Sequence, residues 1–337
     1  MRVALDVKVK IDLTKPIGGI GLGIPLILEE NATKDVAYTE CKSLAEVITA
    51  GFADTTKVYK AANAMFMQDT PPEKIVVCAT TNPTATWLND AENVSKDWRQ
   101  LVVVTNSETA TAYSAIMNKV ETLSNKMFFA NLETDDSTSL TTTGINRTIL
   151  FYCNATEEQP SPVSALVGAT AGLDVGSFTY KNFPLKGIEP QVLTDLQISA
   201  IHEKGGFTFV TKAGDNVTTE GKTAGGEYID IIDSKDYIIN NLEYQTQRTL
   251  NTMKKIPYDD TGIAILESVA VNVMRDAYNK GIIATNTDGS AAYTVDYAKR
   301  EDTEASDRAV RKYVGGQFAF ALAGAVHEVE ITGEIII

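Results

Sequence analysis

Few side chains in this sequence have the types and spacing that catalysis requires. The chain contains two histidines, His202 and His327, and neither lies near a cysteine or serine nucleophile motif. Glu203 follows His202, but the second histidine of a zinc-protease helix is absent. Because acid–base and nucleophilic catalysis need several such groups in a fixed mutual geometry, the sequence predicts no catalytic residues and no enzyme.

A set of carboxylates is the strongest candidate for a metal site. Oxygen ligands suit Mg²⁺ and Ca²⁺, and five aspartates are available: Asp230, Asp233, Asp236, Asp259 and Asp260. Aspartates also cap helices and turns, because a carboxylate accepts hydrogen bonds from free backbone amides. We take capping as the better interpretation, so the sequence predicts neither a metal ion nor a cofactor.

A glycine-rich segment over residues 16–23 precedes an apolar run over residues 24–28. A phosphate-binding loop follows a strand and opens a helix, whereas these glycines come before a predicted strand. We therefore expect a flexible exit from the N-terminal segment and not a nucleotide site.

Three basic residues, Arg308, Arg311 and Lys312, fall at helical spacing within a predicted charged helix over residues 301–313. They would share one face, in a chain whose formal net charge is −14. One interpretation is an ordinary solvated helix face, and the other is a docking surface for an acidic partner. The overall negative charge argues against direct binding of nucleic acid.

Both ends of the chain alternate between apolar and polar residues, as half-buried strands do. The apolar positions are Val3, Leu5, Val7, Val9 and Ile11 at one end, and Val329, Ile331, Ile335 and Ile337 at the other. The polar face of the first strand leans basic and that of the last is acidic. Either the two ends complete one sheet within the same molecule, or they are arms that add strands to neighbouring subunits.

The elements that would position these residues indicate a mixed α/β fold. Buried, non-alternating strands are predicted over residues 74–79, 101–105, 126–130 and 147–153, and helices over 86–98, 107–124 and 161–171. Such a succession is typical of a mostly parallel sheet covered on both faces. Further along, a strand is predicted over residues 226–232 and long helices over 234–253 and 262–280, which indicates a C-terminal α+β domain.

The expected domains are a β-arm over residues 1–18, an α/β domain over 19–190, an α+β core domain over 191–324 and a second β-arm over 325–337. The 337 residues are 44% apolar and 22% charged, which is ordinary for a soluble protein. No apolar run of about 18 residues predicts a membrane span. Three cysteines without metal-ligand spacing favour synthesis in a reducing cytoplasm.

The order of these features resembles one known family, the sheath proteins of contractile phage tails and related phage-tail-like particles. The resemblance begins with the alternating N-terminal strand, its glycine-rich exit and IPLIL (24–28). The other segments that carry it are YTECKSLAEV (38–47), YKAANAMF (59–66), IVV (75–77), KIPYDDTGI (255–263), DRAVRKY (307–313), FAFALAGAVH (318–327) and ITGEI (331–335). They touch both ends and most of the chain, and residues 82–190 are the least diagnostic.

The resemblance implies a viral structural protein that stacks as rings around a tail tube and contracts to drive the tube through the target cell envelope. Its partners would be other copies of itself, which exchange strands through the arms, and the tail tube, baseplate and tail terminator proteins. Arg308, Arg311 and Lys312 would touch the acidic tube. The location would be a virion or phage-tail-like particle, assembled in the cytoplasm of a host bacterium.

Two alternatives remain open from the sequence. The first is an α/β enzyme that acts on a small molecule at the carboxyl ends of the strands, where the polar residues include Thr80, Asn82, Asn131 and Asn154. The second is another tail component, a tube or baseplate protein. The long helices argue against a tube protein, because that class resembles small all-β barrels.

Overall fold

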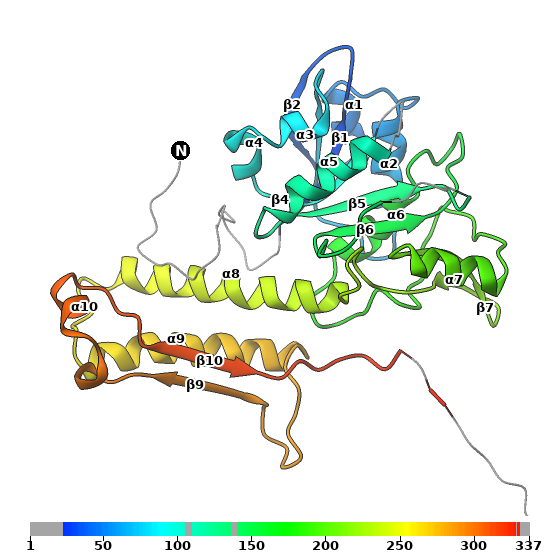
Figure 1. Cartoon of the computed structure of the whole chain (residues 1–337). Coiled ribbons are helices and arrows are strands. Elements are labelled where there is room, and N and C mark those ends of the chain that lie inside the picture. The colour runs from blue at the N-terminus through cyan, green and yellow to red at the C-terminus, as the bar shows by residue number, and fades with distance from the viewer. Residues whose placement is uncertain (1–22, 105–109, 136–139, 328, 331–337) are drawn as a thin grey trace, which may run out of the picture. The chain divides into compact units, whose positions relative to one another are not determined.

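The computed structural model describes residues 23–104, 110–135, 140–327 and 329–330. The chain divides into two compact units, Met1–Glu243 and Tyr244–Ile337 (Figure 1). The division falls inside one long helix, α8 (Ile229–Thr252). We expected a boundary between residues 190 and 191. The structure divides the chain further along, because two strands beyond residue 190 continue the sheet of the first unit.

The first unit is built on an eight-stranded sheet in the order β2-β3-β1-β4-β5-β6-β7-β8. Its strands are β1 (Ile24–Glu29), β2 (Val36–Cys41), β3 (Ile75–Ala79), β4 (Trp98–Val104), β5 (Met127–Leu132), β6 (Thr148–Tyr152), β7 (Gly206–Lys212) and β8 (Asp215–Thr218). All neighbours from β3 to β7 pair in parallel, and β2 and β8 close the two edges in antiparallel fashion. The mostly parallel sheet and the mixed α/β fold class are thus confirmed.

Helices cover both faces of this sheet, because neighbouring strand residues point to opposite sides. Ile27 of β1 belongs to one apolar cluster and Leu26 and Leu28 to the other. The first cluster is covered by α1 (Leu44–Thr49), α2 (Lys57–Phe66) and α6 (Val163–Ala171), and the second by α3 (Thr84–Trp87), α5 (Ala110–Glu121) and α7 (Asp195–Glu203). Continuous burial on both faces explains why these strands read as unbroken apolar runs.

Glycine allows helices α2 and α6 to pack closely. A Cβ atom at Gly168 would lie 2.3 Å from Cα of Met65, so no larger residue fits without separating the helices.

Two predicted elements of the first unit are wrong. The helix predicted over residues 86–98 is replaced by α3, the short helix α4 (Ala91–Ser95) and the start of β4 at Trp98. Helix α3 ends at Trp87, and Asp90 caps α4, because its side chain accepts from the backbone amide of Glu92. The strand predicted over residues 226–232 is instead the entry to α8, where Ile229 and Ile232 lie one helical turn apart and face the core.

The second unit contains the remainder of α8, helix α9 (Asp260–Asn279), and a two-stranded antiparallel sheet of β9 (Tyr293–Tyr297) and β10 (Gly316–Phe320). Asp259 caps α9 by accepting from the backbone amide of Gly262 at 2.9 Å, which confirms the capping interpretation for this residue. A 3₁₀ turn, η1 (Arg300–Asp302), and the short helix α10 (Ala305–Ala309) connect β9 to β10. Over the described part of the chain, no helix has the length and apolar character to cross a membrane.

Candidate functional site

Most of the candidate catalytic and metal-ligating residues lie apart from one another in the structure, and they make hydrogen bonds within the fold. His202 Nε2 lies 2.9 Å from the hydroxyl of Thr219, and Asp260 accepts from the backbone amide of Arg300. At the strand carboxyl ends, Asn131 accepts from the backbone amide of Val163, the first residue of α6, and Asn154 accepts from the loop amide of Thr134. Within the described ranges, no group of three His, Cys, Asp or Glu residues could hold a metal ion.

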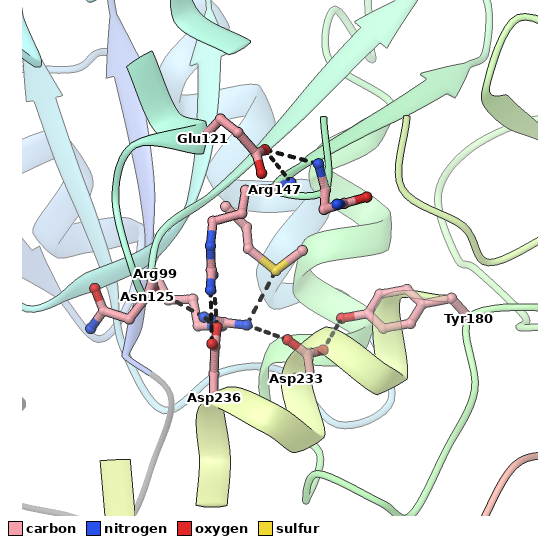
Figure 2. A network of polar contacts seen from close by, with 9 residues as sticks. Arg99, Glu121, Asn125, Arg147, Tyr180, Asp233 and Asp236 are labelled. Atoms are coloured by element: carbon pink, nitrogen blue, oxygen red, sulfur yellow. Dashed lines mark hydrogen bonds and ion pairs between the residues drawn. The ribbon is translucent and has the colours of Figure 1, made fainter. Parts of the chain in front are cut away.

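Two aspartates of the sequence-predicted carboxylate set form a buried ion-pair network (Figure 2). Arg99, which enters from β4, places its two terminal nitrogens 2.5 Å from Asp233 Oδ1 and 2.6 Å from Asp236 Oδ2. Arg147, just before β6, binds both oxygens of Asp236 at 2.8 and 2.9 Å. Tyr180 donates its hydroxyl to Asp233 at 3.0 Å. The network therefore fastens the first two turns of α8 to the sheet.

Neighbouring groups complete this network from the loops at the start of the strands. Arg99 also donates to the backbone carbonyl of Asn125 at 2.9 Å. Glu121, at the end of α5, accepts from the backbone amides of Asn146 and Arg147 at 2.8 Å each and so positions the second arginine (Figure 2). Residues from β4, α5, the segment just before β6 and α8, which are distant in sequence, meet here.

The charges in the network stabilise one another. Burial alone would raise the pKa of Asp236, but the neighbouring Arg99 and Arg147 outweigh it and hold that pKa below its ordinary value. Burial raises the pKa of Tyr180 well above its ordinary value, and the adjacent Asp233 carboxylate adds to the shift. The Arg99 side chain is fully buried, so it depends on its two carboxylates for the charge balance that water would otherwise supply.

The second unit offers a different kind of site, the β9–β10 sheet, to which the described residues add no third strand. Hydrogen bonds join Ala298 to Gly315 and Ala321 to Ala292, at the two ends of the paired register. Because antiparallel pairs alternate between bonded and non-bonded positions, the backbone groups of Phe318 and its second neighbours in β10 point away from β9. A two-stranded sheet is marginal alone and stable with further strands.

Exposed apolar side chains gather on the same stretch of the second unit. Phe318 and Phe320 stack on one face of β10, with ring centroids 6.4 Å apart, and Phe318 is 40% exposed. Two residues that precede the strand, Val310 and Val314, are exposed as well. Apolar surface beside an open strand edge is typical of a site that receives another strand.

The three basic residues do not share a helix face, so that prediction is wrong. Helix α10 ends at Ala309, and Arg311 has a left-handed backbone with a φ of 58°. The amide of Arg311 bonds to the carbonyl of Arg308, and that of Lys312 to the carbonyl of Asp307, the pattern of a Schellman helix end. Glycine usually occupies the position that Arg311 holds here.

Arg308 is held within the fold. Its Nη1 atom donates to the carbonyl of Arg300 at 3.1 Å and to both the carbonyl and the hydroxyl of Thr303. Arg311 and Lys312 are exposed. A partner can therefore reach Arg311 and Lys312 without rearrangement of the loop. We call these two residues the basic loop.

Tyrosines fix the backbone of the basic loop. Tyr313 stacks on Tyr297 of β9 with a centroid separation of 5.7 Å, and it donates its hydroxyl to the carbonyl of Ala298 at 2.9 Å. Tyr258 packs edge-on against Tyr313 and donates to the carbonyl of Lys312 at 3.1 Å. Sequence analysis missed this cluster, although the Tyr258 and Tyr313 positions lie within two of the segments that carried the family resemblance.

The predicted exchange arms fall almost entirely outside the described residues. Val329 is described and is 74% exposed. The other predicted arm positions lie outside the described ranges: Val3, Leu5, Val7, Val9, Ile11, Ile331, Ile335 and Ile337.

Residues 229–335 match the family model described as "E217 tail sheath protein gp31-like, C-terminal domain". The match includes α8, α9, the β9–β10 sheet and the basic loop. No curated protein matches the chain.

Solved structures resemble the chain along its full length. A chain of the anti-feeding prophage baseplate superposes with a TM-score of 0.72 at 13% identity, with 100% of both chains covered. The sheath of an extracellular contractile injection system (PVC) in its contracted state gives 0.72 at 12% identity, covering 99% of this chain and 97% of the other.

The contracted helical sheath of the anti-feeding prophage gives a TM-score of 0.70 at 14% identity, covering 99% of this chain and 98% of the other. The family resemblance recognised in the sequence is thus confirmed: the whole chain has the fold of contractile sheath proteins, and its residues 229–335 match the model of a tail sheath C-terminal domain.

Proposed function

We propose that this chain is the structural subunit of a contractile tail sheath, which polymerises as stacked rings around a tail tube and contracts to drive the tube through a target cell envelope. The observation that carries the proposal is the sheath fold over the whole chain, together with the sheath-type domain at residues 229–335. The likeness to a chain of a prophage baseplate supports a position in the baseplate as a second candidate.

The chain acts mechanically in this proposal and not as an enzyme. The polar residues at the strand carboxyl ends hold loops, and the buried charges fasten α8 to the sheet. Its partners are other copies of itself and the tail tube, baseplate and tail terminator proteins, with no direct role for nucleic acid or a membrane. The particle is a virion or a phage-tail-like assembly, built in the cytoplasm of a host bacterium.

Strand exchange through the β9–β10 sheet links the subunits. The apolar faces of the arms, Val3 to Ile11 at one end and Val329 to Ile337 at the other, would cover the exposed apolar side chains around Phe318. Their backbones would satisfy the outward-pointing groups of β10 and β9, as strand addition does in general. The subunits thereby stay joined while their bodies move.

The basic loop docks on the tube. Arg311 and Lys312 add two positive charges at an exposed, fixed turn of a chain whose net charge is −14. A left-handed conformation costs a residue other than glycine about 1–2 kcal/mol, so an arginine here suggests that its side chain has a use outside the fold.

Replacing Arg311 by glycine and Lys312 by glutamine should therefore separate stability from docking. We expect the free energy of unfolding to stay the same or rise, because relief of the left-handed strain offsets the greater chain entropy of glycine. Tube binding in a pull-down should weaken roughly tenfold, since two charge pairs are lost. Arg275→Gln on the exposed face of α9 is the matched control. Tube binding equal to that of the unmodified chain would remove the basic loop from the tube contact.

The direct test of the proposed function is negative-stain electron microscopy of the purified full-length chain, alone and with a tube protein. The proposal predicts rings or hollow tubes with a lumen wide enough for a tail tube. Discrete globules under all assembly conditions would contradict a sheath subunit, and caps found only at tube ends would favour the baseplate position.

A further inference from the structure

Two exposed basic pairs meet at one end of the second unit. The first pair is the basic loop. The second is Lys254 and Lys255, which lie in the turn of residues 253–259 between α8 and α9. Figure 1 shows this turn and α10 at the same end of the unit. We call Lys254 and Lys255 the basic turn.

Tyr258 joins the basic turn to the basic loop. Its hydroxyl donates to the carbonyl of Lys312 at 3.1 Å, and its ring packs edge-on against Tyr313. Lys255 precedes Tyr258 by three residues, so their Cα atoms are at most about 11 Å apart. Two basic pairs from segments distant in sequence therefore lie close together.

Close packing against α9 fixes the turn itself. A Cβ atom at Gly262, in the first turn of α9, would lie 1.9 Å from the carbonyl oxygen of Pro257. The carboxylate of Asp259 accepts from the backbone amide of the same glycine. Because the backbone that carries both basic pairs is held in place before a partner arrives, binding loses less free energy to ordering this surface.

The fold provides no carboxylate for these four charges. Within the described residues, none of the four basic side chains makes an ion pair or a hydrogen bond. The aspartates next to the basic turn are engaged elsewhere, since Asp259 accepts from Gly262 and Asp260 from the backbone amide of Arg300. On a chain of net charge −14, such a local concentration of positive charge favours an acidic partner.

Apolar side chains accompany both basic pairs. Met253 precedes the basic turn and is 38% exposed, and Val310 and Val314, on either side of the basic loop, are 71% and 54% exposed. Interfaces between proteins commonly combine an apolar centre with a polar rim. The partner should therefore present apolar side chains with carboxylates beside them.

We propose that the basic turn, the basic loop and these three apolar residues form one docking surface for the tail tube, whose matching surface carries carboxylates around an apolar patch. The charges speed the encounter, and the apolar contacts slow dissociation. This inference rests on the proposed function. It adds to that function the residues of the α8–α9 turn and the chemistry of the tube surface.

Lys254→Gln combined with Lys255→Gln tests the basic turn. At low salt, equilibrium binding to polymerised tube protein should weaken roughly tenfold, about as much as after loss of the basic loop. The difference from the parent should shrink at high salt, which screens exposed charges. The matched control is Lys34→Gln combined with Lys42→Gln, which removes the same charge from exposed positions of the first unit and should bind like the parent.

Val310→Ser combined with Val314→Ser tests the apolar part of the surface. Binding should weaken roughly tenfold at low and at high salt alike, because salt does not screen apolar contacts. All the substituted side chains are exposed, so the melting temperatures should equal that of the parent. Unchanged tube binding by either of these two double variants overturns the docking surface.

Assembly without the tube distinguishes this failure from a failure of the proposed function. Electron microscopy of each variant alone should show the rings or tubes of the parent. If loss of the basic loop weakens tube binding and loss of the basic turn does not, the shared surface is wrong and docking through the basic loop stands. If the same substitutions prevent assembly without the tube, the surface receives a second copy and the proposal is wrong. A parent chain that forms no rings or tubes contradicts the proposed function, and the docking surface with it.

Discussion

Replacing Asp236 by alanine should destabilise the first unit by about 3–5 kcal/mol, the usual cost of removing one partner from a buried ion pair. One carboxylate oxygen of Asp236 accepts a hydrogen bond from Arg99, and the two oxygens together accept from both terminal nitrogens of Arg147. The Asp236 side chain is 3% exposed. The variant leaves a fully buried guanidinium with one remaining carboxylate, Asp233. Urea denaturation, followed by a far-ultraviolet circular dichroism signal, measures the loss.

Asp276→Ala, which removes an exposed aspartate of α9, is the control and should cost less than about 0.5 kcal/mol. The pH dependence gives a second check on the Asp236 network. Because the folded pKa of Asp236 is below its ordinary value of 3.8, its contribution is complete above that pH and is lost as the pH falls through the folded value. The gap between the parent and Asp236→Ala should therefore close in acid. A loss below about 1 kcal/mol at neutral pH would show that the network does not fasten α8.

Deleting residues 328–337 should leave a soluble body that no longer polymerises. The deleted residues include the alternating apolar positions Ile331, Ile335 and Ile337, which would supply one of the exchanged strands. Since strand addition joins subunits through main-chain hydrogen bonds as well as side-chain burial, we expect sedimentation velocity to show a single small species where the full chain sediments as large particles.

Single substitutions refine that experiment. Ile331→Asp places a charge on the predicted apolar face and should weaken assembly nearly as much as the deletion. Thr332→Asp adds the same charge to the opposite, polar face and should leave assembly intact. Normal sheaths from the truncated chain would exclude strand exchange at this end.

The main sheet could be predicted from the sequence because local signals and tertiary structure agree there. Residues 74–79 and 147–153 are apolar without alternation, and both became strands covered on two faces. The capping role of Asp259 could also be predicted, since this aspartate directly precedes a stripe of apolar residues at helical spacing. Such features depend on neighbours a few residues away.

The ion-pair network could not be predicted, because its partners are distant along the chain. Arg99 and Asp236 are 137 positions apart, and an arginine next to an apolar strand gives no sign of being fully buried. The same limit explains the error at residues 226–232, where the sequence suggested a strand and the contacts of Asp233 and Asp236 select a helix.

The basic loop shows how a local pattern can mislead. Arg308, Arg311 and Lys312 have helical spacing, yet the helix ends before two of them. Tyr258 and Tyr313 hold this turn through contacts with distant residues, and the sequence gives no measure of their strength. The burial of Glu243 could not be predicted for a related reason: only coordinates show that its Oε2 atom has no hydrogen-bond partner among the residues that the structure describes.

The central claim is that each copy presents an incomplete sheet which a neighbour completes. Hydrogen exchange at the backbone amides of Phe318 and Phe320, in the unassembled chain and in the assembled particle, tests it most directly. These amides point away from β9, so the account predicts rapid exchange in the single chain and slowing by roughly a hundredfold or more after assembly. Equal exchange rates in the two states, or protection already present in the single chain, would contradict it.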